Sequence, residues 1–373
     1  MSKQVPGESS TATPSMLRVI ILDVGHGNCA IAQDDQEVAV IDAPKTSVLP
    51  QCLAMQGTPT VRRLVLSHAD EDHIGGAQAL LADPEIPVKE LWLNPNSRQH
   101  SNTYLDLLTA ARDRYLSTGL KVGTNLNVGA DEQLSFGRIG IEILHPDIVY
   151  AGIGPTDASH PLGPITSNGM SAVLRILLAG QPAVVLPGDM DSNAFATMLS
   201  SGAALCAPVL VFPHHGGAAN SSSDRKFAAA LCDAVQPELI IFSIGRRRYS
   251  NPSPDIMAGI RSAAPRAHIA CTQLSRRCHQ FDLHGGFFDH ILTDLPAAGV
   301  ASGLSCAGSI AIEWNSEGIK YRPLRVSHQE FIATQVSTPL CAHDFTEPTL
   351  VTAMLKTSRV TPKEKRKPVP GKS

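Results

Sequence analysis

The chain has 373 residues, of which 43% are hydrophobic and 17% charged, and its formal net charge is −3. This composition is ordinary for a globular protein and excludes a uniformly basic surface that coats nucleic acid. No stretch approaches the ~20 apolar residues of a membrane span, and residues 1–15 lack a charged start followed by an apolar core. We therefore expect a cytoplasmic protein that does not act at a membrane, with its eight cysteines reduced or bound to metal.

Both ends of the chain differ in composition from the middle. Residues 1–15 are polar, and residues 356–373 form a basic tail with little apolar surface; we expect both segments to be disordered. Between them we expect one folded domain over residues 16–315 and a C-terminal extension over residues 316–355.

Within residues 16–315, short apolar runs alternate with amphipathic stretches. Runs rich in Val, Ile and Leu that end in Gly, Pro or Asp predict strands at 17–25, 37–43, 61–67, 90–94, 139–146, 170–180, 182–189, 207–216 and 238–245. Helical apolar spacing after Ser, Asn or Asp predicts helices at 75–83, 102–118, 192–201, 222–234 and 253–263. So many strands favour an α/β protein with two packed sheets and outer helices, over one doubly wound parallel sheet.

The segment 67–76, SHADEDHIGG, concentrates polar side chains between a predicted strand and a predicted helix. Its spacing lets His68 and Asp70 face one centre, and Asp72 and His73 a neighbouring one. Imidazole and carboxylate groups crowded in this way bind divalent ions, which neutralise the carboxylates and use the lone pairs. The alternative interpretation is a solvated loop that caps the following helix.

Further ligands are expected at two other strand ends. Two metals usually need a bridging carboxylate and a histidine from elsewhere in the chain. Asp189 follows Gly188 in LPGD, and His214 and His215 end another strand in PHHG. Three strand ends would therefore converge on one edge.

In this order, HADEDH, LPGD and PHHG resemble the signature of the metallo-β-lactamase fold superfamily. The segments LDVGHGNCAIA, VIDAP, SNGMSAVLRI and SIGRRRYSNPSP further resemble the soluble hydrolase domain of competence-type DNA-uptake channel proteins, over residues 17–254. The resemblance implies an αββα sandwich of two mixed β-sheets flanked by helices. It also implies a dinuclear site between the loops of one edge.

The resemblance assigns a role to each motif residue. His215 is the favoured last ligand because it abuts Gly216, which leaves His214 a supporting or proton-transfer role. The implied metal ligands are His68 and Asp70 for one ion, Asp72 and His73 for the other, Asp189 as the bridge, and His215.

Two asparagines join Asp72 and His214 as candidate catalytic residues. Asn168 stands where the family has a ligand or a substrate-orienting group, and Asn251 stands where competence-type domains usually carry a histidine. His145 is a weaker candidate, since a single histidine ending a strand is more often a packed residue.

Two divalent ions would give the site its chemistry. Two metals ~3.5–4 Å apart lower the pKa of a bridging water and stabilise charge developing on a phosphoryl or carbonyl oxygen. Because Asp70 replaces a second histidine, the first site is oxygen-rich, and manganese rivals zinc as its metal.

Substrate contacts are expected from Arg246, Arg247 and Arg248, whose guanidinium groups suit phosphate oxygens; a solvated charge cluster is the alternative. The leading hypothesis is a phosphodiesterase acting on nucleic acid or a small phosphodiester such as a signalling nucleotide. The alternatives are a hydrolase of a carboxylic ester, lactone or amide, and a non-enzymatic module that binds a protein partner. The intact ligand set counts against the last, and the oligomeric state stays open.

A separate group of cysteines and histidines could hold a structural zinc. Its first pair is separated by six residues, wider than in common zinc motifs, so packed, reduced cysteines are the favoured interpretation. The group comprises Cys271, Cys278, His279, Cys306, Cys341 and His343.

Overall fold

The structure is a computed structural model that describes residues 16–157, 164–219, 223–246, 249–283 and 288–342. The described residues up to Cys341 form one compact unit, and the fold below is that of this unit. Among the described residues, no helix combines the length and apolar character needed to cross a bilayer.

One sheet has eight strands in the order β14-β13-β1-β2-β3-β4-β5-β6. Neighbours from β14 to β3 are antiparallel, and those from β3 to β6 are parallel. The strands are β1 (Leu17–Ile21), β2 (Ala30–Asp34), β3 (Glu37–Ile41), β4 (Thr60–Leu66), β5 (Glu90–Leu93), β6 (Lys121–Gly123), β13 (Ile310–Asn315) and β14 (Gly318–Arg322).

The other sheet has six strands in the order β12-β11-β10-β9-β8-β7. It is antiparallel from β7 to β9 and parallel from β9 to β12, so both sheets are mixed. The strands are β7 (Ile139–His145), β8 (Val173–Leu178), β9 (Gln181–Leu186), β10 (Val209–Val211), β11 (Leu239–Phe242) and β12 (His268–Cys271).

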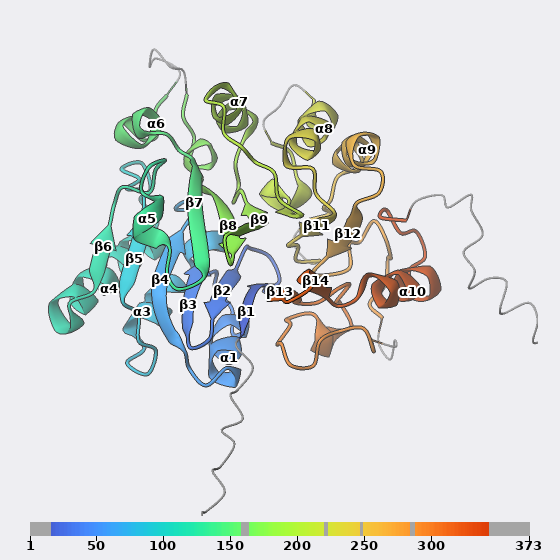
Figure 1. The fold of residues 1–373 in the computed structure, drawn as a ribbon, viewed down its shortest axis with the longest axis horizontal. Helices are drawn as coiled ribbons and strands as arrows, with labels where there is room; N and C mark the ends of the chain where they lie inside the picture. Colours follow the sequence, from blue (N-terminus) through green and yellow to red (C-terminus); the bar gives the residue numbers. More distant parts are fainter. Residues whose placement is uncertain (1–15, 158–163, 220–222, 247–248, 284–287, 343–373) are drawn as a thin grey trace, which may run out of the picture. The chain divides into compact units, whose positions relative to one another are not determined.

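Helices cover the outer face of each sheet, so the layers run helix, sheet, sheet, helix (Figure 1). The first sheet is covered by α1 (Val48–Met55), α2 (Glu71–Ile74), α3 (Ala77–Ala82) and α4 (Asn102–Thr118). The second is covered by α7 (Ser192–Ser200), α8 (Asp224–Val235), α9 (Pro254–Ala263) and α10 (Arg325–Gln335). The remaining short elements are α5 (Asp131–Leu134), α6 (Ile148–Ile153), η1 (Asn168–Met170), η2 (Pro213–Gly216) and η3 (Val300–Ser302).

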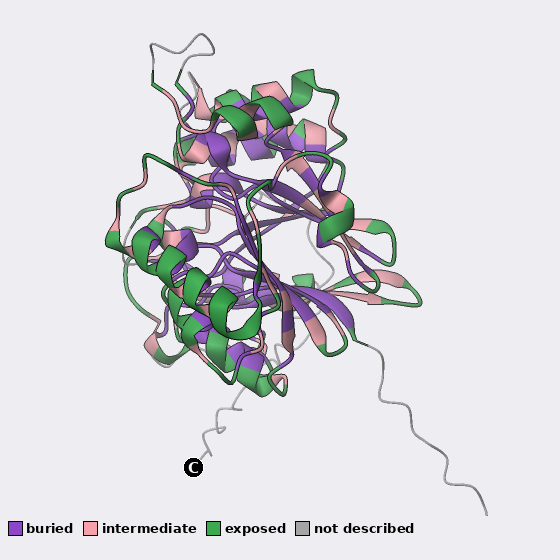
Figure 2. Cartoon of the chain, turned by 90° about the vertical axis from the view of Figure 1, so that its left-hand side faces the viewer, coloured by how far each residue is buried: buried purple, intermediate pink, exposed green. Residues whose placement is uncertain are grey.

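Three apolar clusters hold these layers together. One lies between the inner faces of the two sheets, and each outer face forms another with its helices. In Figure 2 the sheets are buried, whereas the helices are exposed on their outward faces. The expected αββα sandwich of two mixed sheets is confirmed. It has this form because Val, Ile and Leu fill both faces of the central strands, and only helices on both outer faces keep them from water.

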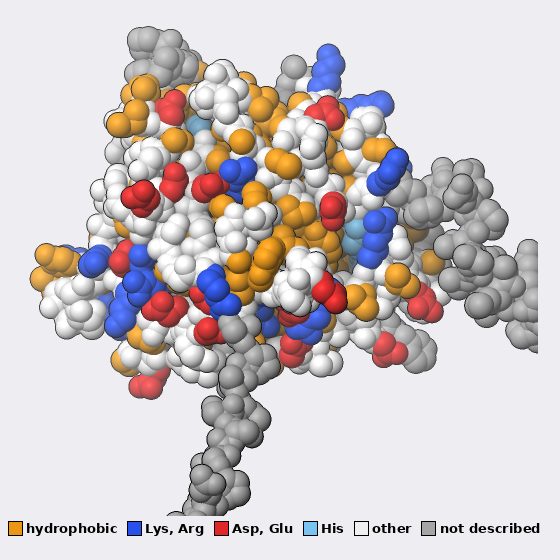
Figure 3. Space-filling model, viewed as in Figure 1, with side chains coloured by type: hydrophobic (Ala, Val, Ile, Leu, Met, Phe, Trp, Pro, Cys, Tyr) orange, Lys and Arg blue, Asp and Glu red, His pale blue; other side chains and the backbone are white. Residues whose placement is uncertain are grey.

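One face of the molecule carries Lys and Arg side chains interspersed with Asp and Glu (Figure 3). Neither sign of charge dominates this view, which agrees with the net charge of −3. Any recognition of an anionic substrate therefore has to come from local groups.

Candidate metal centre

Four side chains from three strand ends meet at one edge of the sandwich. Asp72 and His73 lie in α2 after β4, Asp189 follows β9, and His215 lies in η2 after β10. Each offers one ligand atom, and these atoms all lie within 4.8 Å of one another. His73 Nε2 lies 3.3 Å from Asp189 Oδ1, and His215 Nε2 lies 3.3 Å from Asp72 Oδ2. We call these four residues the ligand group.

The ligand group fits a divalent cation, as its buried polar atoms show. His68 Nε2, His73 Nε2, His215 Nε2 and Asp189 Oδ1 are buried without a hydrogen-bond partner. An unsatisfied buried group costs about 1–3 kcal/mol, so four in one place call for a shared partner. Imidazole nitrogens and carboxylate oxygens are the ligands that zinc and manganese accept.

The far side of each ligating imidazole is held by a hydrogen bond. His73 Nδ1 donates to Asp42 Oδ2 at 2.7 Å, and Ser67 fixes the same carboxylate through its backbone N at 2.7 Å and its Oγ at 2.9 Å. His215 Nδ1 donates to the Ser243 carbonyl at 2.7 Å. With Nδ1 protonated, each ring presents a lone pair on Nε2 to the ligand group.

His68 and Asp70 lie beside the ligand group in a looser arrangement. His68 Nε2 is 3.7 Å from Asp70 Oδ2, and the rings of His68 and His73 are 4.1 Å apart. Asp70 precedes α2, yet its side chain makes no capping hydrogen bond; its Oδ1 instead accepts from Ser167 Oγ at 2.8 Å. Asp70 therefore does not cap α2 through its side chain, and its Oδ2 lies on the side of His68.

The two adjacent histidines of PHHG point to different places. Both have a positive φ, 53° for His214 and 54° for His215, which turns consecutive side chains apart. His215 is buried in the ligand group. His214 lines the neighbouring cavity, with Nδ1 3.5 Å from Asp189 Oδ2 and Nε2 accepting from Asn168 Nδ2 at 3.3 Å.

Electrostatics keep the carboxylates of the ligand group ionised. Burial opposes this for Asp189, but the neighbouring His73 and His215 outweigh it and lower its pKa. Burial likewise opposes ionisation of Asp72, while the neighbouring His215 and His26 lower its pKa. Ionised carboxylates are the form that binds cations.

The histidines of the site shift in opposite directions. Burial, helped by His73, lowers the pKa of His68 to about 4, so this ring is neutral near pH 7. Burial would lower the pKa of His73 as well, but Asp42 and Asp189 raise it well above its usual value. Without a cation, the proton on His73 partly neutralises these two carboxylates.

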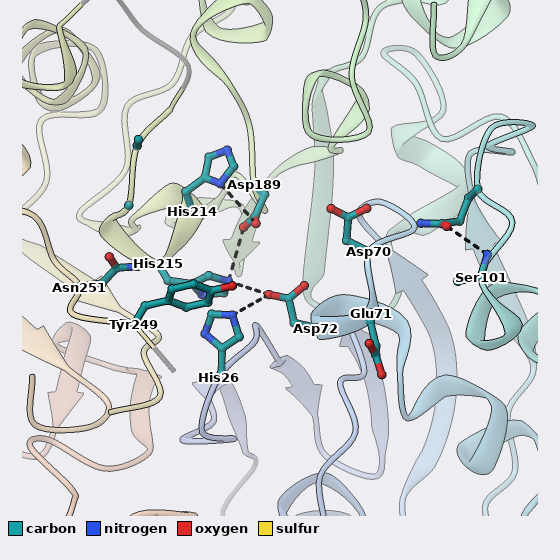
Figure 4. Close-up of a pocket in the computed structure, with 13 residues that line it drawn as sticks. His26, Asp70, Glu71, Asp72, Ser101, Asp189, His214, His215, Tyr249 and Asn251 are labelled. Atoms are coloured by element: carbon teal, nitrogen blue, oxygen red, sulfur yellow. Dashed lines mark hydrogen bonds and ion pairs between the residues drawn. The ribbon is translucent and has the colours of Figure 1, made fainter. Parts of the chain in front are cut away.

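A cavity of about 560 Å³ opens over the ligand group (Figure 4). His26 reaches it from the loop after β1, and its Nε2 lies 3.0 Å from Asp72 Oδ2. The described residues that line this cavity include no Lys or Arg. They are His26, Asp70, Glu71, Asp72, Gln99, Ser101, Asp189, His214, His215, Gly217, Ala218, Tyr249 and Asn251.

Arg246 was expected to contact the substrate, but the structure buries it. This side chain is 3% exposed, and its guanidinium donates to Asp282 Oδ1 at 3.2 Å and to the Leu274 and Phe281 carbonyls, each at 2.9 Å. Arg246 is not among the residues that line the cavity, so its guanidinium holds protein groups there and not a substrate phosphate. Arg247 and Arg248 lie outside the described residues.

Both predicted asparagines lie near the site. Asn168 starts η1, and its Oδ1 is buried without a hydrogen-bond partner. Asn251 lines the cavity. His145, by contrast, is buried against Tyr150 and donates from Nε2 to the Gly169 carbonyl at 2.9 Å, which is a packing role.

The cysteines lie apart from this centre. All eight are described and are free thiols, and burial raises the pKa of Cys271, Cys278 and Cys306. Across the described part of the chain, the ligand group is the one set of three or more candidate ligands close enough to share a metal. His343 lies outside the described residues. The described members of the cysteine and histidine group do not form a set of ligands that could hold a structural zinc.

Two features of the site were not predicted from the motifs. Asp42 is the carboxylate that orients His73, and Ser243 orients His215 through its carbonyl. Asp42 follows the end of a strand within VIDAP, just as Asp189 follows the end of another strand. This similarity is the sequence signal that could have identified Asp42 as a site residue.

Comparisons with known proteins point the same way as the topology. No protein-family model matches the chain. Over 251 residues the chain is 26% identical to Competence protein ComA of Neisseria gonorrhoeae, which covers 65% of this chain and 29% of that protein. The chain therefore spans less than a third of the length of this relative.

Solved structures similar to the chain include two proteins of known fold. Igni18, a metallo hydrolase from Ignicoccus hospitalis KIN4/I, aligns with a TM-score of 0.40 and 18% identity over 68% of this chain and 94% of that chain. YhfI, a metallo-β-lactamase fold protein from Bacillus subtilis, aligns with a TM-score of 0.39 and 11% identity over 68% of this chain and 96% of that chain. The strand order of the two sheets confirms the αββα sandwich, and the match to ComA confirms the resemblance to competence-type proteins.

Proposed function

We propose that the chain is a metal-dependent hydrolase that cleaves a phosphodiester, in a small molecule or in nucleic acid, with a metal-activated water. The observation that supports this most directly is the ligand group: four ligand atoms within 4.8 Å of one another, several of them buried and unpaired, on the floor of an open cavity. No covalent nucleophile is needed for such a reaction.

The residues of the site divide the work as follows. The ligand group would hold one cation, and His68 with Asp70 would hold a second that shares Asp189. Divalent ions bound there supply an acidified water and stabilise negative charge on the oxygen under attack. His214 faces the cavity beside Asp189 and is placed to carry a proton, whereas Asn168 and Asn251 orient substrate through their amides.

A second candidate is the hydrolysis of a carboxylic ester, lactone or amide. The specific observation in its favour is the cavity lining, whose described residues include no Lys or Arg. An uncharged carbonyl substrate needs no cationic partner beyond the metal, whereas a phosphodiester usually has one.

A cytoplasmic location and a protein partner stay predictions.

The test is an activity screen on protein reconstituted separately with zinc and with manganese. Substrates are a bis-aryl phosphodiester, single-stranded DNA, RNA, a cyclic dinucleotide and a lactone. We expect diester cleavage that Asp189→Asn abolishes together with metal binding, while the matched surface variant Asp113→Asn retains both. Lactone cleavage alone would select the second candidate, and elemental analysis without bound metal after reconstitution would refute both.

A further inference from the structure

A small cavity lies between the inner faces of the two sheets, separate from the one that opens over the ligand group. Its volume is about 20 Å³, enough for one water molecule. Its apolar wall includes Ala30 and Leu186, which belong to the cluster between the sheets. Asn28, Asp42 and Ser67 also line it, so the cavity has a polar side.

Asn28 turns its side chain toward this cavity. The residue is 9% exposed, and its Oδ1 is buried without a hydrogen-bond partner among the described residues. Leu22 N donates to the Cys29 carbonyl at 3.0 Å, which continues the pairing of β1 with β2 beyond Ala30. Cys29 packs in the outer cluster with the helices, whereas Ala30 packs in the cluster between the sheets. Because successive side chains of a strand alternate, Asn28 lies on the inner face with Ala30.

Asp42 offers a second acceptor to the same cavity. Its Oδ1 accepts from Ser67 N at 2.7 Å, and its Oδ2 accepts from Ser67 Oγ at 2.9 Å and from His73 Nδ1 at 2.7 Å. A carboxylate oxygen has two lone pairs, so Oδ1 can take one more donor. Two acceptors that line one water-sized space are both satisfied by a molecule that donates to each. Apolar cavities stay dry, but a cavity with such polar partners holds water.

We infer that this cavity binds one water molecule, which donates to Asn28 Oδ1 and to Asp42 Oδ1. The water joins the loop after β1 to the carboxylate that orients His73, so Asn28 is a positioning residue that acts on His73 through Asp42. A bridging water of this kind is nearly as favourable as a direct hydrogen bond. Binding of the water needs no metal, whereas its effect on metal affinity rests on the proposed function.

The water site is tested by magnetic relaxation dispersion, which counts the long-lived internal waters of the full chain without metal and without turnover. Two variants should each lower that count by one. Asn28→Leu removes the acceptor, and Ala30→Val fills the cavity but keeps Asn28. The matched variant Asn125→Leu, at an exposed asparagine, should keep the wild-type count. Urea unfolding of each variant shows that it is folded.

Calorimetric zinc titration tests the positioning role. Asn28→Leu should weaken zinc binding by about 2- to 10-fold, the worth of one net hydrogen bond, and Asn125→Leu should leave it unchanged. Because Asn28 acts through Asp42, the same replacement should have a smaller effect in an Asp42→Asn background.

Three results count against the inference. A water count that stays at the wild-type value in both Asn28→Leu and Ala30→Val overturns the water site. A lost water with unchanged zinc affinity, or effects of Asn28→Leu and Asp42→Asn that add fully, overturns the positioning role. Protein that binds no zinc contradicts the proposed function alone, because the water count still reports on the cavity.

Discussion

His73 and Asp42 form a buried pair in which Nδ1 of the imidazole lies 2.7 Å from Oδ2 of the carboxylate. Asp42 lies directly after β3 and His73 lies in α2, so the pair joins two strand ends 31 residues apart in the chain. Asp42 thereby aims Nε2 of His73 at Asp189 and makes the imidazole a stronger ligand.

The first prediction follows from this pair. Asp42→Asn keeps the shape of the side chain but removes the charge that orients and polarises His73, so metal affinity should fall by about 10- to 100-fold. Calorimetric zinc titration of the variant and of Asp113→Asn, an exposed control, measures the effect. Wild-type affinity in Asp42→Asn would show that the pair only supports folding.

A second prediction separates the two adjacent histidines. His215→Ala removes a member of the ligand group and should lower bound metal, as elemental analysis reports. His214→Ala removes a side chain that faces the cavity and should slow turnover at nearly normal metal content. The reverse pattern would exchange their roles.

A third prediction concerns Arg246, whose guanidinium is buried with Asp282 and two carbonyls. Arg246→Met removes the donor to the Leu274 and Phe281 carbonyls, so the free energy of unfolding should drop by about 1–3 kcal/mol. The KM for a bis-aryl diester should stay unchanged, because Arg246 is not among the residues that line the cavity. If the variant has wild-type stability and a raised KM, Arg246 contacts the substrate and the prediction is wrong.

The sequence predicted the central strands well because their apolar runs are long and sharply ended, as in β4 and β9. Several of the elements it missed lack such a pattern. β6 has three residues and β14 is largely polar, while Pro50 lies inside α1 and hides its helical period. All three are shaped by packing against neighbours rather than by local preference.

The same limit applies to the site. The ligand residues were predictable because each lies in a short motif at the end of a strand. Ser243 and the partners of Arg246 were not, since they reach their contacts across 28 to 36 residues of chain. The place of three adjacent arginines after a predicted strand suggested that they face an anion, whereas Arg246 is buried and donates to Asp282.

A fourth prediction concerns pH and lies away from the metal centre. His268 Nε2 lies 3.1 Å from Nδ1 of His328, a residue of α10. Burial, helped by Arg325, lowers the pKa of His268 from 6.5 to about 4. The unfolded chain therefore binds a proton on this residue below pH 6.5 that the folded chain refuses until about pH 4. Stability from this source is full above pH 6.5 and is lost as the pH falls through that window.

Urea unfolding at several pH values checks this. The loss should be about 1.4 kcal/mol per pH unit for each such histidine, and His268→Gln, which still bonds to His328, should reduce the slope by one proton. Measurements in the presence of a chelator remove the contribution of metal binding. Identical slopes in wild type and variant would show that His268 does not control acid stability.

The last prediction concerns Asn251, which lines the cavity where competence-type domains usually carry a histidine. An amide orients substrate by hydrogen bonds but transfers no proton at neutral pH, so a poor leaving group departs without an acid from this position. Asn251→His should raise the rate on unactivated diesters, by up to ~10²–10⁴-fold if the new imidazole reaches the leaving oxygen. The rate on an activated aryl diester should barely change, because an aryloxide leaves without a proton, and this substrate serves as the internal control. Single-turnover rates on a dinucleotide and on the aryl diester, for wild type and variant at equal metal content, measure both effects. Equal acceleration of both substrates would indicate altered binding, and no acceleration of the dinucleotide would assign proton delivery to another group, with His214 the next residue to replace.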